Sequence, residues 1–177
     1  MRLFIAVRFS EEIHDLLLES IASLKAQSLS GSFTSPQNLH LTLAFIGETN
    51  RVSAIRRAMD EPSADPFSLT VSGCGRFGNL WWAGVKDSLV LSRLAAQLQN
   101  SLRHAGFSIE SRPFKPHITL GRQIVPRDKI FLTVPSVSMT VKKISLMKSE
   151  RLGGRLTYTP IYERSLLQAF SPLNPSR

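Results

Sequence analysis

The residues best suited to chemistry in this sequence are two copies of one short motif, His40-Leu41-Thr42-Leu43 and His117-Ile118-Thr119-Leu120. Each copy lies in an apolar run that favours a β-strand, Leu39–Ile46 for the first and Pro116–Leu120 for the second. Because side chains alternate between the two faces of a strand, the His and the Thr of each copy share a face. Two such pairs facing each other would supply two proton-transfer groups and two neutral hydrogen-bond donors, a set that suits phosphodiester chemistry.

The presence of two copies of the motif is the main evidence that it is functional. With four histidines and nine threonines in 177 residues, the number of His-x-Thr matches expected by chance is roughly 0.2. An isolated copy would be better explained as a strand histidine bonded to its neighbour, whereas two copies in apolar runs indicate function. A zinc hydrolase is disfavoured, because the two histidines would already serve as acid and base and no His-Glu-x-x-His pattern is present.

The two motifs close two segments that have the same order of elements. In both segments an apolar strand is followed by an amphipathic helix and then by the His-Thr strand. His40 follows Val7, the end of the first leading strand, by 33 positions, and His117 follows Val85 by 32. This repetition indicates an internal duplication of one supersecondary unit. An approximate two-fold axis between the units would bring both His-Thr pairs to a common cleft.

Hydrophobic periodicity predicts the elements around the motifs. The expected strands are Leu3–Val7, 67–72, Trp81–Val85, Val137–Val141 and Leu156–Leu166, and the expected helices are 10–26, Val52–Met59 and Leu91–Leu102. Ile144–Ser149 is expected to continue or pair with Val137–Val141. Ser28–Asn38 is rich in Ser, Gly and Pro and is expected to be a loop. We expect one bilobal domain over residues 1–170 and a disordered tail at Ser171–Arg177.

Composition points to a globular protein with a polyanionic partner. The net charge is +9 and the sequence pI about 10.4, which favours binding to nucleic acid over neutral metabolites. The basic residues are densest at Lys142, Lys143, Lys148, Arg151 and Arg155. The bland interpretation of any one of them is a solvated surface charge.

Cysteine content and hydropathy indicate the cellular compartment. The single cysteine, Cys74, excludes an internal disulfide and a multi-cysteine metal site, which fits a reducing cytoplasm. No apolar run approaches the length needed to cross a membrane. A cytoplasmic protein without membrane contact is therefore expected.

The doubled motif and its flanks resemble the two-histidine (2H) phosphoesterase superfamily. Within it, the sequence is most similar to bacterial and archaeal RNA 2′,3′-cyclic phosphodiesterases, formerly named 2′-5′ RNA ligases. The residues that carry the resemblance are Arg2–Val7, Asn38–Glu48 and Arg112–Arg122, with Ser149-Glu150 and Tyr158-Thr159-Pro160 near the end. The resemblance implies an α+β fold in which two lobes with antiparallel sheets, related by a pseudo-two-fold axis, line a central cleft with helices outside.

The resemblance also implies roles for the motif residues. His40 would be the general acid and His117 the general base, while Thr42 and Thr119 would hydrogen-bond the non-bridging phosphate oxygens. No metal or other cofactor would be needed, and RNA ends bearing a 2′,3′-cyclic phosphate, including those of tRNA fragments, would become 2′-phosphomonoesters. Run backward, the same site would join RNA ends through a 2′-5′ linkage without ATP. A monomer is expected.

Substrate-binding residues are predicted around the second motif and among the aromatic side chains. Phe114 and Lys115 belong to a stiff, basic segment that leads to His117. Arg122 is a candidate phosphate ligand, although counting by two from His117 places it on the opposite face unless the strand bulges or ends. The candidates for stacking on the terminal base are Phe9, Phe45, Trp82, Phe114 and Tyr158.

Two alternatives remain open from the sequence. The first is a 2H phosphoesterase that acts on 2′-5′ oligonucleotides or on small cyclic nucleotide phosphates, for which the histidines and threonines would be identical. The second is a non-catalytic RNA-binding module that uses aromatic stacking and basic residues. Substrate profiling distinguishes the first alternative from an RNA 2′,3′-cyclic phosphodiesterase. The second would be indicated if the protein showed no turnover and its histidine variants bound RNA normally.

Overall fold

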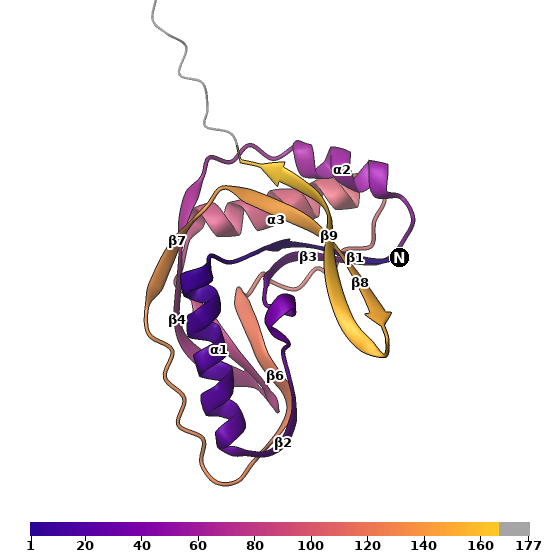
Figure 1. Cartoon of the computed structure of the whole chain (residues 1–177). Coiled ribbons are helices and arrows are strands. Elements are labelled where there is room, and N and C mark those ends of the chain that lie inside the picture. The colour runs from indigo at the N-terminus through magenta and orange to yellow at the C-terminus, as the bar shows by residue number, and fades with distance from the viewer. Residues whose placement is uncertain (167–177) are drawn as a thin grey trace, which may run out of the picture.

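Two antiparallel β-sheets form the framework of the computed structural model, which describes residues 1–166 (Figure 1). The four-stranded sheet has the order β3-β1-β8-β9 and the five-stranded sheet the order β2-β6-β5-β4-β7. The strands are β1 Arg2–Val7, β2 Ser28–Phe33, β3 Leu41–Glu48, β4 Phe67–Phe77, β5 Leu80–Val85, β6 His117–Pro126, β7 Val137–Val141, β8 Lys143–Leu152 and β9 Arg155–Ser165. The α+β prediction with antiparallel sheets is confirmed.

The helices form where the sequence predicts them. They are α1 (Glu11–Ala26), α2 (Val52–Asp60) and α3 (Leu89–His104), with a short 3-10 turn η1 (Pro36–Asn38) before the first motif. The side chain of Ser10 caps α1 by accepting a hydrogen bond from the backbone N–H of Ile13 at 3.4 Å. Ser88 caps α3 in the same way at 3.2 Å. Both serines satisfy an amide that the helix itself leaves without a partner.

The duplicated units exchange their helices. Each unit pairs its leading strand with its His-Thr strand, β1 with β3 and β5 with β6. Helix α1, which follows β1 of the four-stranded sheet, packs on the five-stranded sheet against β2, β6 and β7. Helix α3, which follows β5 of the five-stranded sheet, packs against β3 of the four-stranded sheet. Each half therefore buries the helix of the other half.

Two expectations about strands are wrong. Ser28–Asn38 is not a loop throughout, because Ser28–Phe33 forms β2 and pairs with β6, and Pro36–Asn38 forms η1. Ile144–Ser149 neither continues nor pairs with β7. The chain crosses at Lys142 from β7, which pairs with β4, to β8, which pairs with β1 in the other sheet. The predicted tail Ser171–Arg177 lies outside the described residues.

A shared cluster of buried apolar side chains connects the two sheets. It contains Leu3 and Ile5 of β1 together with Ile118 and Leu120 of β6. On its other face, β1 contributes Phe4 to a smaller cluster. Strand β1 is therefore buried on both faces, which explains its nearly continuous apolar sequence. No helix within residues 1–166 is both long and apolar enough to cross a membrane.

Replacing Ile118 with alanine is expected to lower the free energy of unfolding by about 2–5 kcal/mol, because the fully buried side chain leaves a cavity. Urea unfolding followed by circular dichroism would measure this. Val125→Ala on the same strand is the matched control, since Val125 is 46% exposed and should change stability by less than about 0.5 kcal/mol. Equal effects for the two variants would contradict this account of the core.

Candidate active site

His40 lies immediately before β3, with its ring in an aromatic setting on the face of the four-stranded sheet that carries Phe4. The ring centroid is 4.8 Å from that of Phe4 and 5.1 Å from that of Tyr158, which meets it edge-on. Its Nδ1 atom lies 2.6 Å from the carbonyl oxygen of Asn38. Since a carbonyl oxygen only accepts, Nδ1 carries the proton and donates it.

His117 is the first residue of β6 and repeats this arrangement. Its Nδ1 lies 2.7 Å from the carbonyl oxygen of Lys115, again two residues before the histidine. An aromatic ring also meets this histidine edge-on, that of Phe77 at a centroid distance of 5.2 Å. With Nδ1 fixed as a donor in both rings, Nε2 is the basic nitrogen of each neutral imidazole.

The threonines lie beside the histidines at half-buried positions. The Oγ1 atom of Thr42 is 3.0 Å from Nε2 of His40, so the hydroxyl donates to a neutral ring and accepts from a protonated one. Thr119 is paired with Trp82 of β5. Within residues 1–166 no protein group forms a hydrogen bond with Nε2 of His117, which leaves this nitrogen accessible to substrate or water.

A β-bulge brings Arg122 to the face of His117. Trp82 pairs with Thr119, but the preceding Trp81 pairs with Gly121, so β6 contains one extra residue. Both Leu120 and Gly121 are buried and Arg122 is exposed. The alternation of side chains is thereby shifted by one position. This is the bulge that the sequence requires for Arg122 to share the face of His117.

The two histidines and Arg122 are close enough to interact electrostatically. Burial is the main cause that lowers the pKa of His40 below its usual value, while the hydrogen bond to the Asn38 carbonyl acts in the opposite sense. The positive charges of Arg122 and His117 lower the pKa of His40 further. The positive charges of Arg122 and His117, which lie in the five-stranded sheet, thus act on His40 of the other sheet, and a site with this excess of positive charge favours an anion.

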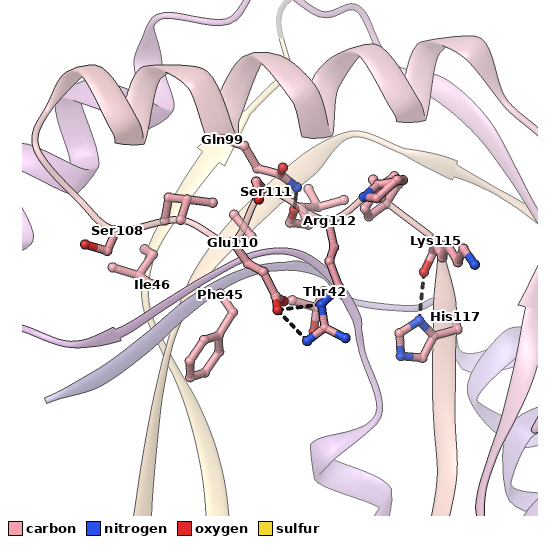
Figure 2. Close-up of a pocket in the computed structure, with 15 residues that line it drawn as sticks. Thr42, Phe45, Ile46, Gln99, Ser108, Glu110, Ser111, Arg112, Lys115 and His117 are labelled. Atoms are coloured by element: carbon pink, nitrogen blue, oxygen red, sulfur yellow. Dashed lines mark hydrogen bonds and ion pairs between the residues drawn. The ribbon is translucent and has the colours of Figure 1, made fainter. Parts of the chain in front are cut away.

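A groove of about 750 Å³ opens beside one His or Thr of each motif, whereas His40 and Thr119 do not line it. Thr42 and His117 line it, together with three of the predicted substrate-binding residues, Phe45, Phe114 and Lys115 (Figure 2). Phe45 is 49% exposed, and the guanidinium of Arg2 lies 5.0 Å from its ring centroid.

The far wall of the groove comes from the segment between α3 and β6. Arg112 and Glu110 of this segment form an ion pair with each other, and Gln99 of α3 donates to the carbonyl oxygen of Leu43 at 2.9 Å (Figure 2). The volume of the groove falls in the usual range for ligand sites. Its lining combines aromatic, cationic and hydrogen-bonding groups, as a nucleotide requires.

A second hollow lies beside Arg122. Its volume is about 380 Å³, and Ser32, Asn79, Leu80 and Gln123 complete its lining. Gln123 has a φ of 53°, in the left-handed region that side chains other than glycine seldom adopt. Arg122 thus borders this hollow and also acts electrostatically on His40.

The structure does not bring all predicted aromatic residues to the site. Phe9 packs against the main core and lines neither hollow. Trp82 is half-buried with its ring against Phe77 at a centroid distance of 5.3 Å. A Cβ atom at Gly75 would lie 2.3 Å from the Trp82 indole, so the glycine is what admits the ring. Tyr158, in contrast, lies directly against His40.

Three residues of the site were not predicted, namely Phe4, Asn38 and Phe77. The two phenylalanines contact the histidine rings described above. Phe4 could have been predicted as a site residue, because it lies in the leading strand that pairs with the first motif strand. Asn38 is buried, and its side-chain amide donates to the Leu156 carbonyl at 2.8 Å and accepts from the Tyr158 N–H at 3.0 Å.

Asn38→Ala is expected to lower the free energy of unfolding by about 1–3 kcal/mol, because two backbone groups of β9 lose their partner. Turnover should fall as well, because the segment that orients His40 loses its attachment to β9. Thermal unfolding and steady-state kinetics would measure the two effects. Asn100→Ala is the control, since the exposed Asn100 side chain has one partner within residues 1–166, the Arg103 guanidinium. Native stability in Asn38→Ala would contradict the anchoring role.

Metal ligands do not gather in the part of the chain that the structure describes. Within residues 1–166 there is no group of three or more His, Cys, Asp or Glu side chains that could hold a metal ion. The donors that do converge at the site are imidazoles, hydroxyls and a guanidinium, which suit proton transfer and anion binding.

Comparisons with known proteins give a consistent result. Residues 13–153 match the 2′-5′ RNA ligase superfamily. The RNA 2′,3′-cyclic phosphodiesterase of Thermotoga maritima is 34% identical over 176 residues, which cover 92% of this chain and 92% of that protein. The protein of the same name from Archaeoglobus fulgidus is 33% identical over 160 residues, covering 86% and 84% of the two chains. The crystal structure of E. coli LigT complexed with 3′-AMP has a TM-score of 0.82 at 29% identity, covering 94% of this chain and 98% of that one.

Proposed function

Because this chain belongs to the 2′-5′ RNA ligase superfamily, we propose that it is a 2H phosphoesterase that hydrolyses RNA 2′,3′-cyclic phosphate ends to 2′-phosphomonoesters. The observation that carries the proposal is the matched geometry of the two histidines. Both Nδ1 atoms donate to the carbonyl oxygen two residues earlier, at 2.6 and 2.7 Å. Each Nε2 is thereby left to exchange a proton with the substrate or with water.

The two histidines divide the proton transfers. The Nε2 atom of His117 takes a proton from water as the water oxygen attacks phosphorus. The bond from phosphorus to the 3′ oxygen breaks, and Nε2–H of His40 protonates that leaving oxygen. The product carries a 2′-phosphate and a 3′-hydroxyl, and one proton has passed from water to the product through the pair of imidazoles. Run in reverse with an RNA 5′-hydroxyl in place of water, the same steps join two ends through a 2′-5′ linkage.

The charge of the substrate prepares His40 for its role. Burial and the charges of Arg122 and His117 hold the pKa of His40 down in the free protein. An anionic cyclic phosphate bound between these groups offsets their charge and favours the imidazolium that must act as the acid. Once Nε2 of His40 is protonated it no longer accepts a hydrogen bond from the Thr42 hydroxyl. That hydroxyl can then donate to a non-bridging oxygen of the phosphate. Thr119 supplies the second neutral donor.

Several features favour RNA ends, such as those of tRNA fragments, over small cyclic nucleotides. The net charge of +9 favours a polyanion. The groove lined by Thr42 and His117 offers Phe45 and Phe114 for stacking and Lys115 for a phosphate. Every proposed catalytic residue comes from one chain, so a monomer suffices. The single cysteine fits a cytoplasmic enzyme.

The test is incubation of the purified, EDTA-treated protein with an RNA that ends in a 2′,3′-cyclic phosphate. We expect conversion to the 2′-phosphate and no change in a control RNA that ends in a linear 3′-phosphate. Chromatography that resolves 2′- from 3′-phosphate ends reads the regiochemistry. A 3′-phosphate product, or loss of activity with EDTA that zinc or magnesium restores, would contradict the proposal.

A further inference from the structure

The hairpin between β8 and β9 extends beyond the sheet that carries it. The two strands pair from Lys143 with Ser165 to Leu152 with Arg155, whereas the pairing of β1 with β8 ends at Ser149. Residues 150–157, here called the arm, therefore form a two-stranded ribbon closed by a glycine turn, and the hairpin curls past η1 (Figure 1). A free ribbon of this kind is only marginally stable in water, so it needs an attachment.

The attachment of the arm is the segment that orients His40. Strand β9 is at the edge of its sheet, and the Asn38 amide bonds two backbone groups of that edge, Leu156 O and Tyr158 N–H. The carbonyl of the same Asn38 accepts from His40. The base of the arm is thus fixed against the catalytic histidine, and Arg155 lies three residues farther out than Tyr158, about 10 Å along the strand.

The arm carries positive charge that no acidic group within residues 1–166 neutralises. Arg151 and Arg155 are exposed, and neither forms an ion pair within this part of the chain. Arg151 donates only to the carbonyl oxygen of Gly154, at 3.1 Å. The one carboxylate of the arm, Glu150, is held by Lys148 at 2.6 Å.

Apolar surface accompanies the two guanidiniums. Leu152 is 53% exposed and Leu156 is 40% exposed. A surface that served solubility alone would mix charges of both signs and bury its leucines. Cations next to apolar side chains are instead suited to a single-stranded nucleic acid, whose phosphates and sugar–base faces alternate.

We propose that the arm is an RNA-binding surface for the nucleotides that precede the cyclic end, with Arg151 and Arg155 contacting their phosphates. This inference rests on the proposed function, because it takes the RNA end to be bound at His40. The arm then selects RNA chains over cyclic mononucleotides, whose phosphate does not extend beyond the catalytic histidines. The arm contributes to binding and leaves the chemistry at the cyclic phosphate unchanged.

The size of the effect follows from counterion release. Each phosphate contact on a single strand contributes about 0.7 to the slope of log K against log salt, which is roughly fivefold in affinity at 0.1 M salt. Loss of both contacts should therefore lower kcat/KM for RNA about 25-fold and reduce the salt slope by about 1.4. For a 2′,3′-cyclic mononucleotide kcat/KM should stay the same.

The experiment compares Arg151→Gln/Arg155→Gln with the matched variant Arg57→Gln/Arg93→Gln. Both pairs are exposed, and both substitutions remove the same charge, but Arg57 and Arg93 lie on α2 and α3. kcat/KM is measured for an RNA oligonucleotide with a cyclic end and for a 2′,3′-cyclic mononucleotide over a range of salt concentrations. Fluorescence anisotropy with a labelled RNA ending in a 2′-phosphate measures binding independently of turnover.

A selective loss on RNA in the arm variant alone supports the proposal. Equal losses in both variants would show a general effect of net charge, and equal losses on both substrates would show an effect on His40; either result overturns it. If the wild-type protein turned over neither substrate, the proposed function would fail. The anisotropy comparison would then still decide whether the arm binds RNA.

Discussion

Replacing His117 with alanine is expected to lower kcat/KM for an RNA with a cyclic phosphate end by about 10²–10⁴-fold, the usual contribution of a proton-transfer group. The reason is Nε2 of this ring, which no protein group within residues 1–166 binds, while Nδ1 donates to the Lys115 carbonyl. Replacing His40 should have an effect of similar size, since protonation of the leaving oxygen depends on it. Rates at saturating and at limiting substrate would separate lost chemistry from lost binding.

The chain supplies its own control for the histidine variants. His104 is exposed at the end of α3 and lines neither of the two hollows. His104→Ala should keep native activity while removing the same side chain. Binding of the RNA to His117→Ala should be close to native, because imidazole contributes mainly to the transition state. Near-native turnover in either motif variant would rule out the assigned role of that histidine.

Replacing Arg122 with glutamine should lower activity by about 10²–10³-fold, the usual cost of removing a group that stabilises developing negative charge. It should also raise the pKa of His40, because the positive charge of Arg122 is one of the causes that lower it. With Arg122 in place, a larger fraction of His40 is neutral at any given pH than without it. An NMR titration of the His40 ring proton would show the midpoint move to higher pH in the variant.

Two measurements strengthen the test of Arg122. Arg127→Gln removes an exposed charge just beyond the end of β6 and should leave both the titration of His40 and the activity as they are. Addition of inorganic phosphate to the wild-type protein should raise the pKa of His40, because a bound anion favours the imidazolium. An unchanged midpoint in Arg122→Gln would place the guanidinium too far from His40 to share its substrate.

Both motifs are short segments of the sequence, and the predictions based on them needed only the order of neighbouring residues. A His and a Thr two positions apart share a face of any strand, so the pairs needed no tertiary information. The helices were equally readable, because the apolar residues of α1 and α3 recur with a period of 3.6. The partner strands of β7 and of β8 could not be predicted. Adjacent strands usually pair, but Lys142 carries the chain from one sheet to the other.

The sequence by itself determined the chemical groups and the duplicated order of elements, because both follow from residue identity and short-range periodicity. The class of fold was implied by the resemblance to the 2H phosphoesterase superfamily. Tertiary structure alone decided which side Arg122 faces, through a bulge set by the pairing of β6 with Trp81 and Trp82 of β5. It also decided that Asn38 joins the edge of β9 to His40, across 118 positions from Asn38 to Leu156. Such contacts depend on the register between distant strands, which no local pattern in a single sequence encodes.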